Sequence, residues 1–243
     1  MFQDELLSRF QPPKKELFTD FFNQKTSSSR LFISGLNGSS LALLAAPIFD
    51  ELSHNQLFIF PDRESSAFFY HDLEKIMGDT QKTLEQKRVH YFPSSYRRPY
   101  DFDEIDNANI KLRSEIINKL VYEQGKYVIV TYPEALSEKL VSTQYLRKNS
   151  FTVQKGDNLP IDVLISFLYE YQYSQEDFVF EPGQFAWRGA IFDIFSYSEE
   201  YPYRIELSGD IVESVRLFDT NTQLSVKEVD KLHIMPLSSS VDV

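Results

Sequence analysis

A glycine-rich stretch near the N-terminus has the residue types of a phosphate-binding loop. The apolar run LFIS (31–34) is followed by a turn containing Gly35 and Gly38, and then by an Ala/Leu-rich segment at 39–52. A strand, a glycine turn and a helix N-terminus together form the site at which nucleotide-binding domains hold phosphates with backbone N–H groups. A working Walker A loop also needs a Lys for the β- and γ-phosphates and a Ser or Thr for Mg²⁺.

The side chains that would perform this chemistry are missing. Counted from Gly35, the second glycine, the lysine and the hydroxyl residue of the G-x-x-x-x-G-K-[ST] pattern are replaced by Ser40, Leu41 and Ala42. No lysine occurs anywhere between residues 30 and 75, so no other register restores the pattern. Leucine cannot neutralise a phosphate and alanine cannot reach a metal ion. We therefore expect a degenerate, inactive nucleotide loop.

No other motif for catalysis or metal binding stands out. The acid pair Asp103-Glu104 follows SSYRRPY, whereas the metal-binding pair of an ATPase follows an apolar strand. The chain contains no cysteine and no G-x-S-x-G elbow. The four histidines are scattered without the close spacing of zinc ligands: His54, His71, His90 and His233. We expect no catalytic residue, no metal and no cofactor.

Two pairs of arginines are candidates for binding. Arg97 and Arg98 lie in YRRPY (96–100), where the flanking tyrosines suit stacking on bases, although four acids follow directly. Arg188 stands between Trp187 and Gly189. Period-2 alternation in YPYRIELSGD puts two sets of side chains on opposite faces of a strand, Tyr203, Ile205 and Leu207 on one and Arg204, Glu206 and Ser208 on the other.

We expect the apolar face of that strand to pack inward and Arg204 to reach solvent. The residues alone allow two interpretations of Arg188 and Arg204. They form surface ion pairs with nearby acids, which contribute little to stability, or they are anchors for a partner, because arginine is enriched at binding hot spots.

The two halves of the chain have different patterns of predicted secondary structure, and these patterns position the candidate residues. In the first half, strands expected at 30–34, 56–60, 88–92 and 126–130 alternate with helices at 39–52, 62–77 and 108–122, which predicts βαβ units and a parallel sheet. The second half has a helix at about 160–171 and then short strands separated by turns, which predicts an α+β module with a mainly antiparallel sheet. These strands are expected at 177–180, 184–195, 203–207, 211–218 and 231–236.

Charge separates the same two halves. The whole chain has 243 residues and a net charge of −11, of which residues 151–243 contribute −10 through six basic and sixteen acidic side chains. An acidic module is poorly suited to grip nucleic acid, whose affinity comes largely from Lys and Arg, and better suited to a basic protein surface. No apolar run approaches the length of a membrane span and no signal peptide is evident, so we expect a cytoplasmic protein.

A long ordered pattern in the second half identifies a family. From residue 181, EPGQFAWRGAIFDIFSYSEEYPYRIELSGDIVESVRLFD contains a Gly, an R-G-x-x-x-D-I-F core, a P-Y-R strand and an S-V-R-x-F-D strand, and I-M-P follows at 234–236. The chain thereby resembles the N-terminal UvrB-homology region of bacterial transcription-repair coupling factor (Mfd). FISGLNGSSLALLAA, VHYFPSSYRRPYDF and YVIVTYPEAL match in the same order, so the resemblance covers essentially the whole chain.

The resemblance implies both an architecture and a partner. It implies a degenerate UvrB-like α/β domain at 1–147 without ATPase activity, a UvrA-binding α+β domain at 148–236 and a polar tail at 237–243. UvrA recognition would fall to Arg188 and Arg204, with Glu206 and Ser208 beside them; Ser208 stands where the family often has an aromatic residue. RNA polymerase and DNA would be bound by other domains of the full-length protein, and a monomer is expected. A DNA-contacting role for Arg97 and Arg98 is the alternative, and a residual ATPase comes third.

Overall fold

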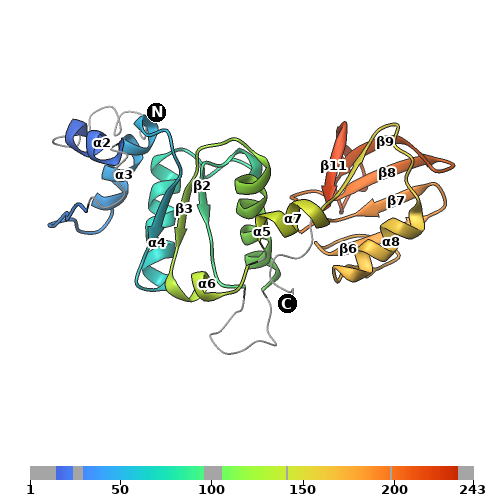
Figure 1. The fold of residues 1–243 in the computed structure, drawn as a ribbon, viewed down its shortest axis with the longest axis horizontal. Coiled ribbons are helices and arrows are strands. Elements are labelled where there is room, and N and C mark those ends of the chain that lie inside the picture. The colour runs from blue at the N-terminus through green and yellow to red at the C-terminus, as the bar shows by residue number, and fades with distance from the viewer. Residues whose placement is uncertain (1–14, 24–29, 96–105, 141, 198, 235–243) are drawn as a thin grey trace. The chain divides into compact units, whose positions relative to one another are not determined.

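The computed structural model describes residues 15–23, 30–95, 106–140, 142–197 and 199–234 (Figure 1). The candidate arginines Arg97 and Arg98, the acid pair Asp103-Glu104 and the expected tail at 237–243 lie outside these residues. The chain packs into two units, one drawn from residues 1–94 and 124–137 and the other from 95–123 and 138–243. The expected division after residue 147 stays a prediction.

A small parallel sheet forms the centre of the first unit. Its strands are β1 (Gln56–Ile59), β2 (Val89–Tyr91) and β3 (Val128–Thr131), in the order β1-β3-β2. Strand β3 pairs in parallel with both neighbours, with Val128 opposite Gln56 on one side and Val89 on the other. The predicted parallel sheet is confirmed for these strands, each within about two residues of its expected bounds.

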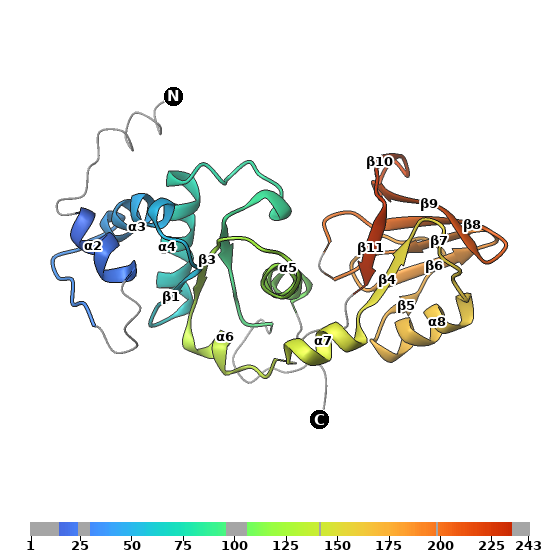
Figure 2. The ribbon, with the colours of Figure 1, turned by 45° about the horizontal axis from the view of Figure 1, so that its top comes forward.

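Helices cover one face of this sheet (Figures 1 and 2). The helices of the unit are α2 (Lys15–Asn23), α3 (Ser40–Glu51), α4 (Arg63–Ile76) and α6 (Pro133–Ser137), with a 3₁₀ turn at Leu84–Gln86. Helix α4 begins where Asp62 accepts a hydrogen bond from the backbone N–H of Ser65 at 2.7 Å, a standard N-cap. The buried core draws on α3, α4, β2 and β3 and contains Ala42, Ala45, Ala46, Phe49, Phe69, Tyr70, Leu73, Met77, Val89, Val128 and Val130.

The strand predicted at 30–34 does not form. Residues 30–37 have no regular secondary structure, and Phe32 in this run is 90% exposed. Strand propensity alone cannot order a segment, because a strand needs a neighbour to complete its hydrogen bonds. The sequence prediction was therefore wrong for this element, although the helix that follows it is present as predicted.

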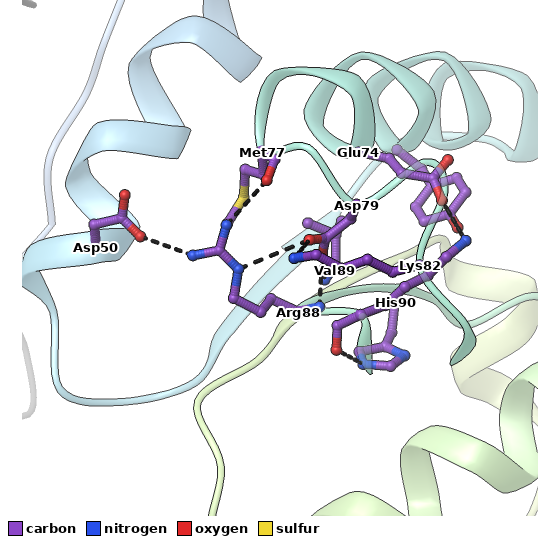
Figure 3. A network of polar contacts seen from close by, with 10 residues as sticks. Asp50, Glu74, Met77, Asp79, Lys82, Arg88, Val89 and His90 are labelled. Atoms are coloured by element: carbon purple, nitrogen blue, oxygen red, sulfur yellow. Dashed lines mark hydrogen bonds and ion pairs between the residues drawn. The ribbon is translucent and has the colours of Figure 1, made fainter. Parts of the chain in front are cut away.

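A buried aspartate fixes the beginning of β2, as Figure 3 shows. The fully buried Asp79 accepts hydrogen bonds from the backbone N–H groups of Arg88 at 2.6 Å and Val89 at 3.0 Å, and from Lys82 Nζ at 2.6 Å. The Arg88 guanidinium donates to the Met77 carbonyl at 3.0 Å. Burial alone would raise the pKa of Asp79, but these donors outweigh it and hold the pKa below its usual value. This network joins the end of α4 to the sheet.

The second unit is built on a six-stranded sheet. Its order is β10-β9-β8-β7-β6-β5, antiparallel throughout except for the β5–β6 pair. The strands are β5 (Ser174–Gln175), β6 (Gln184–Arg188), β7 (Ile191–Ile194), β8 (Tyr203–Ser208), β9 (Ile211–Phe218) and β10 (Ser225–Glu228). The unit also contains α5 (Asn107–Tyr122), α7 (Thr143–Asn149), α8 (Ile161–Glu170) and an antiparallel pair of β4 (Phe151–Gln154) with β11 (Lys231–Ile234).

One face of the large sheet forms the main core of this unit. Side chains of β6 to β9 pack there against α8 and the β4–β11 pair; the set includes Val153, Leu164, Leu168, Phe185, Phe192, Ile194, Ile205, Val215 and Leu232. The mainly antiparallel sheet and the helix at 160–171 are confirmed. The strand predicted at 177–180 is wrong, since that segment is irregular and the short β5 precedes it. Among the described residues, no helix is both long and apolar enough to cross a membrane.

Candidate functional site

The glycine loop before α3 lacks the lysine of a Walker loop. Gly35 and Gly38 adopt positive φ angles of +82° and +54°. Leu41 stands where a Walker loop has its lysine, and its side chain packs against the apolar core of the first unit. Across the described ranges, no group of three or more His, Asp or Glu side chains could hold a metal ion. This geometry provides a turn and a helix start, without a cation for phosphates.

The other candidate residues lie on the second face of the six-stranded sheet. In β8 the burial alternates as predicted, with Tyr203, Ile205 and Leu207 buried in the core. Arg204 and Glu206 therefore project from the opposite face, which we call the arginine face. Its members among the described residues include Ala186, Arg188, Asp193, Phe195, Arg204, Glu206, Arg216 and Phe218.

A single carboxylate joins the two predicted arginines. Asp193 Oδ2 accepts a hydrogen bond from Arg188 Nη2 at 2.7 Å. The same carboxylate accepts two more from Arg204, from Nε to Oδ1 at 2.7 Å and from Nη2 to Oδ2 at 2.9 Å. The Arg204 contact is thus a two-bond fork, which is a strong and directional way for arginine to bind a carboxylate. We call these three residues the arginine clamp.

The local fold brings the clamp together. Strands β6 and β7 form a hairpin in which Ala186 lies opposite Asp193, and the intervening turn contains Gly189 at a φ of +61°. On its other side Asp193 lies directly opposite Arg204 in the register of β7 and β8. Directly opposed residues in an antiparallel pair have neighbouring side chains on the same face. Asp193 therefore lies on the middle one of three adjacent strands, with Arg188 on one neighbouring strand and Arg204 on the other.

Burial makes the clamp more than a surface ion pair. The Asp193 side chain is 1% exposed, compared with 16% for Arg204 and 37% for Arg188. Arg204 also donates to Gln223 Oε1 at 3.0 Å, and its guanidinium carbon lies 4.2 Å from the centroid of the Phe218 ring. The hydrogen bond to Asp193 raises the pKa of Arg204 above its usual value, although burial opposes the shift. The arginine pair leaves the clamp with one net positive charge.

These values correct one expectation and refine another. Arg204 was expected to reach solvent, but most of its side chain is covered, because Asp193, Gln223 and Phe218 surround the guanidinium. Arg188 is the more exposed of the two. Both do pair with an acid, but that acid is buried, so the surface-pair interpretation does not describe the geometry.

The structure places Glu206 and Ser208 outside the clamp. Glu206 accepts a hydrogen bond from Ser214 Oγ at 2.9 Å and forms an ion pair with Arg216. Arg216 lies directly opposite Arg204 on β9, so each of these neighbouring arginines has its own carboxylate. Ser208 is exposed at the end of β8, past a register shift after Glu206, and pairs with Ile211.

The sequence reasoning did not single out Asp193, although a signal was available. The quoted pattern R-G-x-x-x-D already contains Asp193 five residues after Arg188. A two-residue turn after an arginine brings the chain back along the next strand, so an acid at this spacing can return to the same face. Once the hairpin is recognised, the pairing of Asp193 with Arg188 follows.

Comparison with known proteins places the large sheet in a known domain family. Residues 151–239 match the family model for the UvrB interaction domain, which spans the clamp and the whole large sheet. The chain is similar to transcription-repair-coupling factors of Bacillus subtilis (29% identity, 84% of this chain), Escherichia coli K12 (26%, 87%) and Rickettsia bellii (30%, 65%). These matches cover 17%, 18% and 14% of the respective relatives, so the chain spans about a sixth of their length.

Three observations now agree on one assignment. The large sheet and its clamp lie inside the matched interaction domain. The preceding unit has a parallel sheet, and a glycine-containing turn without a Walker lysine precedes α3. The similarity to coupling factors extends across both units, over more than four fifths of the chain in two relatives. The chain is a UvrB-homology region of the transcription-repair coupling factor family.

Proposed function

We propose that this chain is a non-catalytic recruitment module that binds UvrA in transcription-coupled nucleotide excision repair. The observation that carries the proposal is the arginine clamp, which lies on a sheet face within the interaction domain and holds Arg188 partly exposed. Arginines fixed by a buried partner lose little conformational freedom on binding, which favours their use as interface anchors.

The charge of the module supports a protein partner. Its surface is strongly acidic, with the clamp as a local positive feature, so a long phosphate backbone would be repelled over most of the module. An acidic group on UvrA would be complementary to Arg188, while basic groups around it would be complementary to the rest of the module. In the cell this work would take place in the cytoplasm.

The first unit contributes no chemistry to this proposal. Its glycine loop has Leu41 in place of the phosphate-binding lysine, and this side chain is committed to the core. We expect no increase in the melting temperature of the chain at millimolar ATP with Mg²⁺, because a ligand that binds the folded state would stabilise it. A shift of several degrees would restore the ATPase interpretation.

The decisive experiment is calorimetric titration of the chain with UvrA. Arg188→Ala is the sharpest variant, because Arg204 still satisfies Asp193 with two hydrogen bonds when Arg188 is lost. Arg204→Ala removes both of those bonds and needs a parallel unfolding measurement. Lys155→Ala is the control, since Lys155 is an exposed cation of the same unit whose ion pair with Glu228 is also exposed.

Arg188→Ala should weaken binding at least fivefold without unfolding the chain, while Lys155→Ala should bind as the wild type does. Equal binding by all three proteins would refute the role of the clamp. Failure of the wild type to bind UvrA would refute the proposal as a whole.

A further inference from the structure

A short irregular segment crosses the arginine face beside the clamp. In this segment, residues 176–181, the side chain of Val179 points into the sheet and is 1% exposed, in a small cluster with Ala186, Phe195 and Phe218. Its neighbours Phe178 and Phe180 are 50% and 58% exposed. The segment is therefore attached to the sheet by Val179 and presents a phenylalanine on each side of that residue.

Hydrogen bonds hold the segment in this position. Gln184 Oε1 accepts from the backbone N–H groups of Phe180 and Glu181, both at 2.9 Å. The backbone carbonyl of Asp177 accepts from Arg188 Nη1. Because these contacts fix the backbone on both sides of Val179, the two phenylalanines are held outward by the fold. An apolar group that is ordered before binding loses little entropy when a partner covers it.

Phe178 and the clamp form one continuous surface. The guanidinium carbon of Arg188 lies 4.6 Å from the centroid of the Phe178 ring. A cation at this distance from an aromatic face is attracted by the ring quadrupole. Arg188 thus contacts Asp193, the Asp177 carbonyl and Phe178, and a partner that covers its exposed part would lie close to the ring.

The surroundings of the two rings define the chemistry of the partner. The same segment carries three exposed acids, Glu176, Asp177 and Glu181. An apolar centre with an arginine and a charged rim is the usual composition of a protein-binding hot spot. The complementary surface would offer apolar side chains to the rings, basic side chains to the acids and an acid or carbonyl oxygen to Arg188.

We infer that Phe178 and Phe180 are the apolar anchors of the UvrA-binding surface and that Phe178 also positions Arg188 for that contact. This inference rests on the proposed function and extends it to residues that neither the sequence motifs nor the family match singles out. The occupant is UvrA, because Phe178 contacts Arg188, the residue proposed to bind UvrA, and Phe180 lies two residues further along the same segment.

The test measures UvrA binding by calorimetry for Phe178→Ala and Phe180→Ala. Phe68→Ala is the matched control, since Phe68 is a phenylalanine on α4 of the first unit and is 66% exposed. We expect the dissociation constant to rise about tenfold for each of the two variants and to stay within twofold of wild type for the control. Val179→Ala adds a third variant, which should weaken binding through loss of the attachment and also lower the melting temperature.

The outcomes separate this inference from the function on which it rests. If Arg188→Ala weakens binding but Phe178→Ala and Phe180→Ala bind as wild type does, the recruitment function stands and the aromatic anchors are refuted. If Phe68→Ala weakens binding as much as they do, the effect is not specific to this segment and the inference also fails. If the wild type does not bind UvrA, both are refuted.

Discussion

Replacement of Asp193 by Asn should destabilise the second unit without changing its shape. The amide has nearly the volume of the carboxylate, so packing is preserved while the negative charge is removed. Arg188 and Arg204 then face a neutral group whose NH₂ cannot accept their hydrogen bonds. The variant therefore isolates the electrostatic contribution of the clamp.

The size of the effect follows from the contacts. Asp193 accepts three charge-assisted hydrogen bonds at 2.7, 2.7 and 2.9 Å and is 1% exposed. Breaking a buried ion pair by removing one partner costs about 3–5 kcal/mol. Because both arginines keep some contact with water and the Asn oxygen retains one acceptor, we expect the low end, about 3 kcal/mol. Arg188→Ala should cost about 1 kcal/mol, since its guanidinium is more exposed and its loss leaves Asp193 paired.

Urea unfolding followed by tryptophan fluorescence is the appropriate assay. Trp187 is the only tryptophan of the chain and lies on β6, so its fluorescence reports on the second unit. With an m-value of about 1.5 kcal/mol/M, a loss of 3 kcal/mol moves the midpoint by about 2 M urea. Asp210→Asn is the control, because Asp210 is exposed in the same unit.

A shift below about 0.5 M urea for Asp193→Asn, with an unchanged m-value, would refute the reasoning. It would mean that water replaces the lost carboxylate and that the clamp is an ordinary surface pair. A shift as large for Asp210→Asn would show that the measurement responds to charge in general.

Three further predictions concern other parts of the chain. The pKa of Asp79 is lowered, so its contribution to stability is present above pH 3.8 and is lost as the pH falls below that value. In urea titrations followed by circular dichroism, Asp79→Asn should remove this loss of stability in acid. Burial, with a smaller effect of Lys231, lowers the pKa of His233 below 6.5, so protonation of the ring opposes folding. The free energy of unfolding should therefore fall as the pH drops below about 6.5, and His233→Gln should reduce this pH dependence. NMR titration of the ring is the direct check. Gly183→Ala should lower the melting temperature more than Gly209→Ala does: both glycines have positive φ, but a Cβ at Gly183 would lie 2.4 Å from the Tyr197 hydroxyl oxygen, whereas at Gly209 it meets nothing within 4 Å. Equal losses for the two glycine variants would contradict the steric argument.

Local patterns predicted most elements of the fold. The helix predicted at 62–77, which is α4, and the alternation in β8 both follow from local rules, and both were confirmed. The segments at 30–34 and 177–180 were wrongly predicted as strands, because both are apolar but strand formation depends on partners distant in sequence. Val179 shows the difference, since its segment is held to the sheet by this inward side chain and by hydrogen bonds to the Gln184 and Arg188 side chains, and it forms no strand.

Only part of the candidate site could be predicted from local sequence patterns. Alternation along β8 placed Arg204 and Glu206 on the face opposite the core, and this arrangement was confirmed. Their partners were not predictable from one strand, because Asp193 and Arg216 come from the two strands on either side and depend on register. Burial of Arg204 was missed for the same reason, since Phe218 and Gln223 are contributed by a strand and a turn further along the chain.

The shared carboxylate of the clamp also restricts how this surface can change over evolutionary time. Asp193 accepts hydrogen bonds from both Arg188 and Arg204. Loss of Asp193 therefore leaves two arginines without their carboxylate, whereas loss of one arginine still leaves Asp193 paired with the other. Substitutions should therefore be accepted in a fixed order, with Arg188 changing first and with Asp193 and Arg204 changing only as a pair. A lineage that alters its partner can adjust Arg188 at low cost, while Arg204 and Asp193 change together or not at all.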